Sequence, residues 1–167
     1  MANLKKIRDE AGSQREYLQM LCNKFGDFKV CSSFTADKGE ICWTKHYSVL
    51  DIWHDEAQMW RLDSATHRTI LPNEVVLDLD EQTDINLHFA VNLLDRIGIN
   101  YEVFSTGSRG YHIHILFNSE LSAEARKDFL MLFNADRSKA SSEAMIAIEF
   151  ARHWKSHKIK SIISIKS

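Results

Sequence analysis

Apolar and polar residues follow different periods in different segments of this chain, and these periods predict its elements. Segments with apolar residues three or four positions apart, bounded by capping residues and glycines, predict helices. Alternating or short continuous apolar runs beside turn residues predict strands. The predicted helices cover 1–25, 84–97 and 122–133, and the predicted strands lie within 28–62 and over 74–80, 101–105, 111–117, 145–150 and 159–165.

Two of these strands have polar side chains on one face. Asp78 and Asp80 end the buried run 74–80 and point to the same side, because strand side chains alternate between faces. His112 and His114 likewise share one face of the strand 111–117, opposite an apolar face. Helices and strands mix without strict alternation, which predicts an α+β fold with a mostly antiparallel sheet covered by helices.

Length and composition indicate one ordinary globular domain over residues 1–167. The chain is 44% hydrophobic and 26% charged, which is typical of a soluble protein. It has no run of eighteen apolar residues and no apolar signal core near its first residue, so we expect a cytoplasmic protein with no membrane partner.

Charge is balanced overall but not along the chain. The formal net charge is −2, which does not by itself indicate nucleic-acid binding. After Glu149, however, every charged residue except the histidines is basic: Arg152, Lys155, Lys158, Lys160 and Lys166. Such a stretch is either a local phosphate-binding patch or a solvated basic tail.

The pair Asp78 and Asp80 suits a metal ion. Two carboxylates on one face repel each other and resist burial unless a cation lies between them. Magnesium and manganese prefer oxygen ligands, supplied by carboxylates and substrate phosphates. A structural role, such as capping the helix that follows, is the alternative.

The segment 105–112 suits a polyphosphate. Gly107 and Gly110 allow close backbone approach to a ligand, and Arg109 between them is suited to bidentate phosphate contact. A hairpin turn alone would also need the glycines. Together with the two aspartates, this segment predicts a metal–nucleotide site.

Three cysteines, Cys22, Cys31 and Cys42, are the candidates for a zinc site together with His46. Their spacings are long and irregular, and no C-x-x-C pair occurs. We therefore expect buried free thiols and no structural zinc.

Residues 70–160 resemble the archaeo-eukaryotic primase superfamily, including the primase-polymerases of archaeal plasmids and viruses. Asp78-Leu79-Asp80 is similar to its Asp-x-Asp motif. Ser105 to His112 resembles its Ser-Gly-x-x-Gly-x-His pattern with one inserted residue, and Ala151 to His157 resembles a third motif at His153 and Lys155. His157 departs from that motif, which usually has glycine there.

The resemblance implies an RRM-like antiparallel sheet and a template-directed nucleotidyltransferase that makes primers on single-stranded DNA from NTPs or dNTPs. It implies two Mg²⁺ or Mn²⁺ ions held by Asp78, Asp80 and a third carboxylate, for which Asp136 is favoured over Glu149. The nucleotide-binding residues that it implies are Ser105, Ser108, Arg109, His112, His153 and Lys155. No zinc-stem or accessory helical domain is evident, so we expect either a minimal catalytic core or a chain whose partners, such as a helicase or an accessory primase subunit, are separate proteins.

Two other functions are compatible with parts of the sequence. His112-Ile113-His114 also resembles the His-hydrophobic-His metal motif of nicking endonucleases, with Tyr17 as the candidate nucleophile, but this leaves the two aspartates unexplained. A histidine-triad hydrolase is disfavoured because position 116 is leucine. The other open alternative is a non-catalytic nucleotide- or nucleic-acid-binding subunit on the same fold.

Overall fold

The computed structural model describes residues 3–79, 84–153 and 155–167. Its helices are α1 (Leu4–Glu10), α2 (Gln14–Phe25), α3 (Val49–Trp53), α4 (Trp60–Ser64), α5 (Asp84–Ile97) and α6 (Ala123–Leu132), with 3₁₀ turns η1 (Glu56–Gln58) and η2 (Arg137–Ala140). Its strands are β1 (Lys29–Cys31), β2 (Ser33–Thr35), β3 (Ile41–Trp43), β4 (Tyr47–Ser48), β5 (His67–Thr69), β6 (Glu74–Leu79), β7 (Tyr101–Ser105), β8 (Tyr111–Leu116), β9 (Met145–Ala147) and β10 (Ser161–Lys166).

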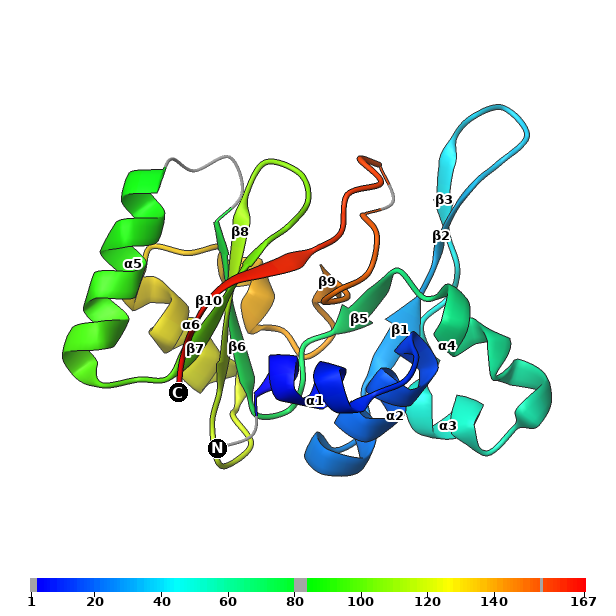
Figure 1. The fold of residues 1–167 in the computed structure, drawn as a ribbon, viewed down its shortest axis with the longest axis horizontal. Helices are drawn as coiled ribbons and strands as arrows, with labels where there is room; N and C mark the ends of the chain where they lie inside the picture. The colour runs from blue at the N-terminus through cyan, green and yellow to red at the C-terminus, as the bar shows by residue number, and fades with distance from the viewer. Residues whose placement is uncertain (1–2, 80–83, 154) are drawn as a thin grey trace.

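These strands form two four-stranded sheets and a hairpin. The first sheet has the order β10-β7-β8-β6 and the second the order β4-β1-β5-β9, and all neighbouring strands in both are antiparallel. The hairpin β2-β3 projects from the rest of the molecule (Figure 1). The predicted α+β class with antiparallel sheets flanked by helices is confirmed.

The first sheet has one apolar face and one face on which apolar and polar residues mix. Val75, Leu77 and Ile113 point to the face covered by α5 and α6, where they join one hydrophobic core. The opposite face, which carries Asp78 and His112, is turned toward the second sheet (Figure 1). The predicted division of the residues of β8 between two faces is therefore confirmed.

The predicted helices agree closely with the structure. Within the predicted helix 1–25, the described residues form two helices, α1 and α2, because Ser13 begins a new helix by accepting a hydrogen bond from the Glu16 N–H. Ser122 caps α6 in the same way, and Gly98 follows α5 with a φ of +74°. Within the described ranges, no helix is both long and apolar enough to cross a membrane.

The prediction of short strands over 28–62 holds only for its first half. From Val49 the chain is helical, in α3 and α4. Ser48 starts α3 by accepting a hydrogen bond from the Asp51 N–H, and Val49 and Ile52, three residues apart, are both buried. The β-branched residues that suggested strand here are therefore the buried stripe of a helix.

The three cysteines are free thiols. Cys22 and Cys31 are buried, and burial raises the pKa of each to about 11. Cys42 is half-buried in β3. Both buried thiols therefore remain protonated at neutral pH, and in this form they are unreactive.

Candidate functional site

A pocket of about 200 Å³ lies where the two sheets meet, because strands of both contribute to its wall. β6 and β8 of the first sheet contribute Asp78 and His112, and β5 of the second contributes His67. The remaining lining residues are Thr106, Ser108, Lys139, Met145, Ile146, Ala147 and His153.

Asp78 and His112 lie opposite each other on β6 and β8, and both are buried. His112 Nε2 is 3.6 Å from Asp78 Oδ1, and Lys139 Nζ from η2 is 3.4 Å from Asp78 Oδ2. Asp78 Oδ1 and His112 Nδ1 have no hydrogen-bond partner among the described residues. Because buried polar atoms are usually paired, these two atoms are suited to contact a ligand.

The charge state of the pocket follows from these contacts. Burial raises the pKa of Asp78, but His112 and Lys139 outweigh that effect and lower it to about 2. Burial lowers the pKa of His112 to about 3. At neutral pH Asp78 is therefore an anion and His112 is uncharged, so the ammonium of Lys139 is the charge that balances the carboxylate.

The glycine-rich turn between β7 and β8 forms one wall. Thr106 Oγ1 accepts hydrogen bonds from the Ser108 N–H at 3.3 Å and the Gly110 N–H at 3.4 Å, which holds the turn closed. Gly107 has a φ of +76°, and its carbonyl accepts a hydrogen bond from the Ser156 hydroxyl. A hydrogen bond thus attaches the β7–β8 turn to a segment about fifty positions later in the chain.

The loop that contains His153 is a tight turn. The His153 carbonyl accepts a hydrogen bond from the His157 N–H at 2.8 Å, and the His153 N–H donates to the Lys158 carbonyl at 2.7 Å. His157 has a φ of +58°, in the left-handed region that glycine prefers. Although His157 replaces the usual glycine of the motif, the backbone has the conformation that a glycine would favour.

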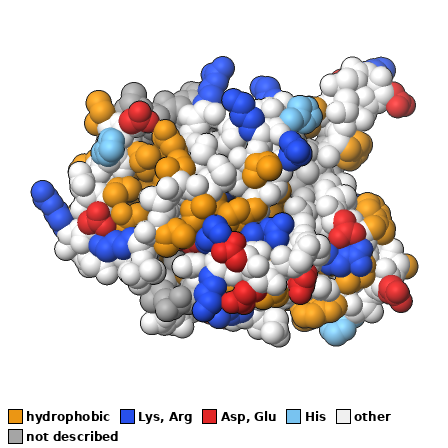
Figure 2. All heavy atoms as spheres, viewed as in Figure 1, with side chains coloured by type: hydrophobic (Ala, Val, Ile, Leu, Met, Phe, Trp, Pro, Cys, Tyr) orange, Lys and Arg blue, Asp and Glu red, His pale blue; other side chains and the backbone are white. Residues whose placement is uncertain are grey.

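The predicted nucleotide-binding residues fall into two groups. Ser108, His112 and His153 line the pocket. Ser105 is half-buried at the end of β7, and Arg109 and Lys155 are exposed; the described lining of the pocket does not include these three. Figure 2 shows Lys and Arg side chains gathered at the top of the molecule, over the β7–β8 turn and the segment 151–160.

The predicted metal-binding carboxylates are not brought together among the described residues. Asp80 lies outside the described residues. Asp136 is exposed and caps η2, where its two oxygens accept hydrogen bonds from the Ser138 N–H and hydroxyl at 2.9 and 2.8 Å. Glu149, the alternative, is buried, and its oxygens accept hydrogen bonds from Arg68, Tyr17 and Lys160.

A two-metal site held by three carboxylates does not fit the described part of the chain. Over 3–79, 84–153 and 155–167, no three His, Cys, Asp or Glu side chains are placed to hold one metal ion. The only carboxylate in the described lining of the pocket is Asp78, and an ammonium group already lies against it. The roles of Asp80 and Asp136 as metal ligands stay predictions.

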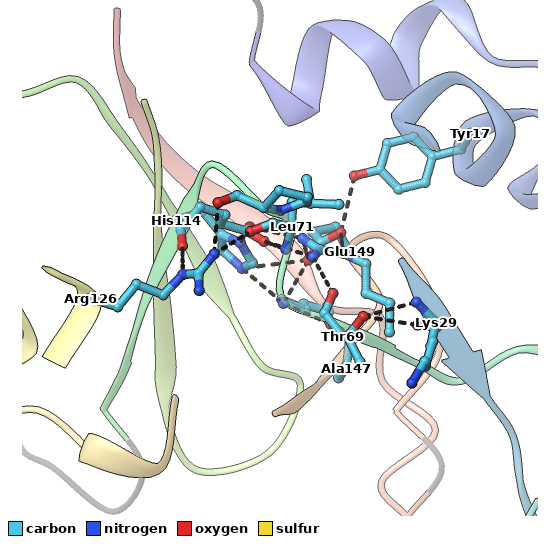
Figure 3. Close-up of polar contacts among 12 residues, drawn as sticks. Tyr17, Lys29, Thr69, Leu71, His114, Arg126, Ala147 and Glu149 are labelled. Atoms are coloured by element: carbon cyan, nitrogen blue, oxygen red, sulfur yellow. Dashed lines mark hydrogen bonds and ion pairs between the residues drawn. The ribbon is translucent and has the colours of Figure 1, made fainter. Parts of the chain in front are cut away.

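Sequence reasoning missed a buried ionic network beside the pocket (Figure 3). The Arg68 guanidinium bonds Glu74 at 2.7 and 2.9 Å and Glu149 at 2.9 and 3.0 Å. His114 Nδ1 is 2.6 Å from Glu74, and Lys160 Nζ is 3.0 Å from His114 Nε2. The available signal was the presence of charged residues inside apolar segments, since such residues are buried only when paired.

The network corrects one expectation from the charge distribution. Lys160 was grouped with the surface-accessible basic residues near the end of the chain, but it is fully buried. It donates hydrogen bonds to the Ala147 carbonyl at 2.8 Å and to Glu149 at 3.2 Å. Burial lowers its pKa to about 8. Lys160 therefore joins β10 to the end of β9 and is not available to a surface ligand.

The network also bears on the nicking-endonuclease alternative. Tyr17 is fully buried in α2, and its hydroxyl donates to Glu149 at 3.1 Å. His114 is buried between Glu74 and Lys160. A nucleophilic tyrosine must reach the DNA backbone, and Tyr17 has no exposed atom with which to do so. The structure thus disfavours this alternative.

Comparison with known proteins supports a likeness in fold. No protein-family model matches the sequence, and no curated protein matches it either. Among solved structures, the chain is similar to the polymerase domain of Mycobacterium tuberculosis Ligase D, solved in complex with DNA, with a TM-score of 0.50 and 14% identity. The match covers 81% of this chain but only 63% of that one. That domain belongs to the archaeo-eukaryotic primase superfamily, which the sequence motifs resemble.

Proposed function

We propose that this chain is a nucleotidyltransferase of the primase-polymerase type that binds a nucleoside triphosphate in the Asp78 pocket and acts on single-stranded DNA. Two independent lines support the proposal. The fold resembles a polymerase domain solved with DNA. The motif residues Asp78, Ser108, His112 and His153, which are spread over 76 positions of the sequence, line one pocket. This convergence is the observation on which the proposal rests.

The chemistry of the pocket suits the triphosphate of a nucleotide. Lys139 supplies a positive charge, Ser108 a hydroxyl, and His112 and His153 ring nitrogens that interact with phosphate oxygens. Arg109 and Lys155 are exposed and lie one and two positions after Ser108 and His153, respectively. They would extend this positive surface. Ser105 would hold the turn at the end of β7.

A single-stranded template would lie along the exposed basic side chains of the β7–β8 turn and the segment 151–160 (Figure 2). Such strands bind in positively charged grooves, and their affinity falls with salt. The resemblance implies two Mg²⁺ or Mn²⁺ ions. The described residues do not by themselves form a site for these ions.

The test is primer synthesis and extension on single-stranded DNA with labelled NTPs or dNTPs, with Mg²⁺, Mn²⁺ or EDTA. Asp78→Asn removes the charge without changing the shape of the side chain, and should abolish synthesis while the thermal unfolding remains cooperative. Asp128→Asn, on the exposed surface of α6, is the matched control and should be fully active. Wild-type rates in Asp78→Asn would reject this site.

A second candidate is a non-catalytic nucleotide- or DNA-binding subunit that works with a separate catalytic protein. Two observations favour it: the Lys139 ammonium lies beside Asp78, and no three-ligand metal group is present in the described ranges. Tight binding of nucleotide or DNA with no synthesis by wild type, under any of these ionic conditions, would establish this candidate. A helicase or accessory primase subunit remains a predicted partner for either function.

A further inference from the structure

We propose that Lys139 is the resident cation of the Asp78 pocket. Its ammonium occupies the position beside Asp78 that a divalent ion would otherwise take, and the pocket binds a polyphosphate through Lys139 directly. This inference deepens the proposed function, since it concerns the same pocket. Its decisive measurement, metal binding by the protein alone, is independent of whether the chain polymerises nucleotides.

Both the backbone and the ammonium group of Lys139 are held in place by neighbouring elements. It belongs to η2, which Asp136 starts by accepting hydrogen bonds from Ser138, and η2 packs against β6 and α6. Its ammonium donates a hydrogen bond to the Met145 carbonyl of β9 at 3.2 Å and lies 3.4 Å from Asp78 Oδ2. The Lys139 side chain is only 16% exposed. An ammonium so held is part of the pocket wall.

Asp78 needs a cation partner, and the groups around it limit which one. The carboxylate is 8% exposed, so an unpaired charge there would be costly. His112, the other described group near it, lies opposite on β8. Lys139 Nζ lies 3.4 Å from Asp78 Oδ2, closer than His112 Nε2 lies to Asp78 Oδ1 at 3.6 Å, so Lys139 supplies the compensating charge.

A divalent ion and Lys139 exclude one another at this carboxylate. An ion bound to Asp78 would lie within a few ångströms of the ammonium, and like charges at that distance repel strongly in a buried pocket. Replacement of Lys139 by a neutral residue should therefore open a metal site.

The first experiment measures Mn²⁺ binding by the full chain without nucleotide, from the electron paramagnetic resonance signal of free Mn²⁺. Lys139→Met should bind one Mn²⁺ at least about tenfold more tightly than wild type, because it removes the competing charge. Lys139→Arg keeps the charge and should bind Mn²⁺ as weakly as wild type. The double variant Asp78→Asn/Lys139→Met should lose the new site, and Lys127→Met, on exposed α6, should resemble wild type.

The second experiment measures binding of inorganic tripolyphosphate in excess EDTA by calorimetry. Wild type and Lys139→Arg should bind it, and Lys139→Met should bind at least about tenfold more weakly. Circular dichroism and thermal unfolding show whether each variant is folded. If Lys139→Met does not fold, Lys139→Gln replaces it, because glutamine can still donate a hydrogen bond to the Met145 carbonyl.

Three results would overturn the inference. One is equal Mn²⁺ affinity in wild type and the neutral variant; another is tight, Asp78-dependent Mn²⁺ binding by wild type; the third is no tripolyphosphate binding by wild type in EDTA. Failure of primer synthesis alone would instead count against the proposed function. The two proposals can therefore fail separately.

Discussion

Gly107 lies directly against Lys158. A side-chain carbon added to Gly107 would stand 2.8 Å from the Lys158 carbonyl oxygen, closer than such atoms pack. The Gly107 carbonyl also accepts the hydrogen bond of Ser156. The two walls of the pocket, the β7–β8 turn and the loop that contains His153, are therefore in direct contact, and only glycine leaves room for it.

We expect Gly107→Ala to separate these walls. The substitution adds both a backbone clash and the strain of a φ of +76°, and should cost about 2–4 kcal/mol of unfolding free energy. Gly39→Ala is the matched control, because Gly39 has a φ of +77° but nothing within 4 Å of an added carbon. It should cost only about 1 kcal/mol. Equal losses in urea unfolding of the two variants would show that the Lys158 contact is unimportant.

His157→Gly should stabilise the loop that contains His153. A φ of +58° is unfavourable for a residue with a Cβ, and glycine relieves about 1 kcal/mol of that strain. His157→Val should instead destabilise the protein, since a β-branched residue is least compatible with this conformation. Thermal unfolding of both variants checks the prediction, with Lys155→Gly as the control in the same loop. A less stable His157→Gly would contradict it.

Arg68→Met should be among the most destabilising substitutions in the chain. It leaves Glu74 and Glu149 without their main partner in a fully buried site, and loss of one partner of a buried ion pair costs about 3–5 kcal/mol. Arg15→Met, which breaks the exposed pair with Asp63, should lower the unfolding free energy far less, because solvent screens that pair. Urea unfolding measures both. Similar small losses would mean that the buried network contributes little to stability.

His67 should make the protein less stable in mild acid. Burial, together with the nearby basic side chains of His153, Lys160 and Lys139, lowers its pKa from 6.5 to about 4. Between these two pH values the unfolded chain binds the proton and the folded chain does not, so stability falls as pH decreases from 6.5 to 4. This group should account for roughly 2 kcal/mol of that loss.

The check is the unfolding free energy of wild type and His67→Gln as a function of pH. The variant should show a shallower decline over this range, and the two curves should run parallel above pH 7. His46→Gln, at an exposed position, is the control and should follow wild type. Parallel curves for His67→Gln and wild type below pH 6.5 would exclude the effect.

The sequence by itself determined the local structure around the pocket. The period of two in β8 put His112 and His114 on one face and Ile113 on the other, and the structure confirms it. The helical spacing of apolar residues predicted a helix over 84–97, and α5 has the same first and last residues. Such patterns succeed because they depend only on neighbouring residues, whose side-chain directions the backbone geometry fixes.

Only the tertiary structure decided which side chains meet. Charged residues inside apolar segments signal burial, but nothing in the sequence indicates that Lys139 lies against Asp78, or that Arg68 and Lys160 both pair with Glu149. Periodicity states which face a side chain occupies, but not which distant segment covers that face. Partners for buried charges are chosen by the packing of one sheet against the other, and that packing exists only in the folded chain.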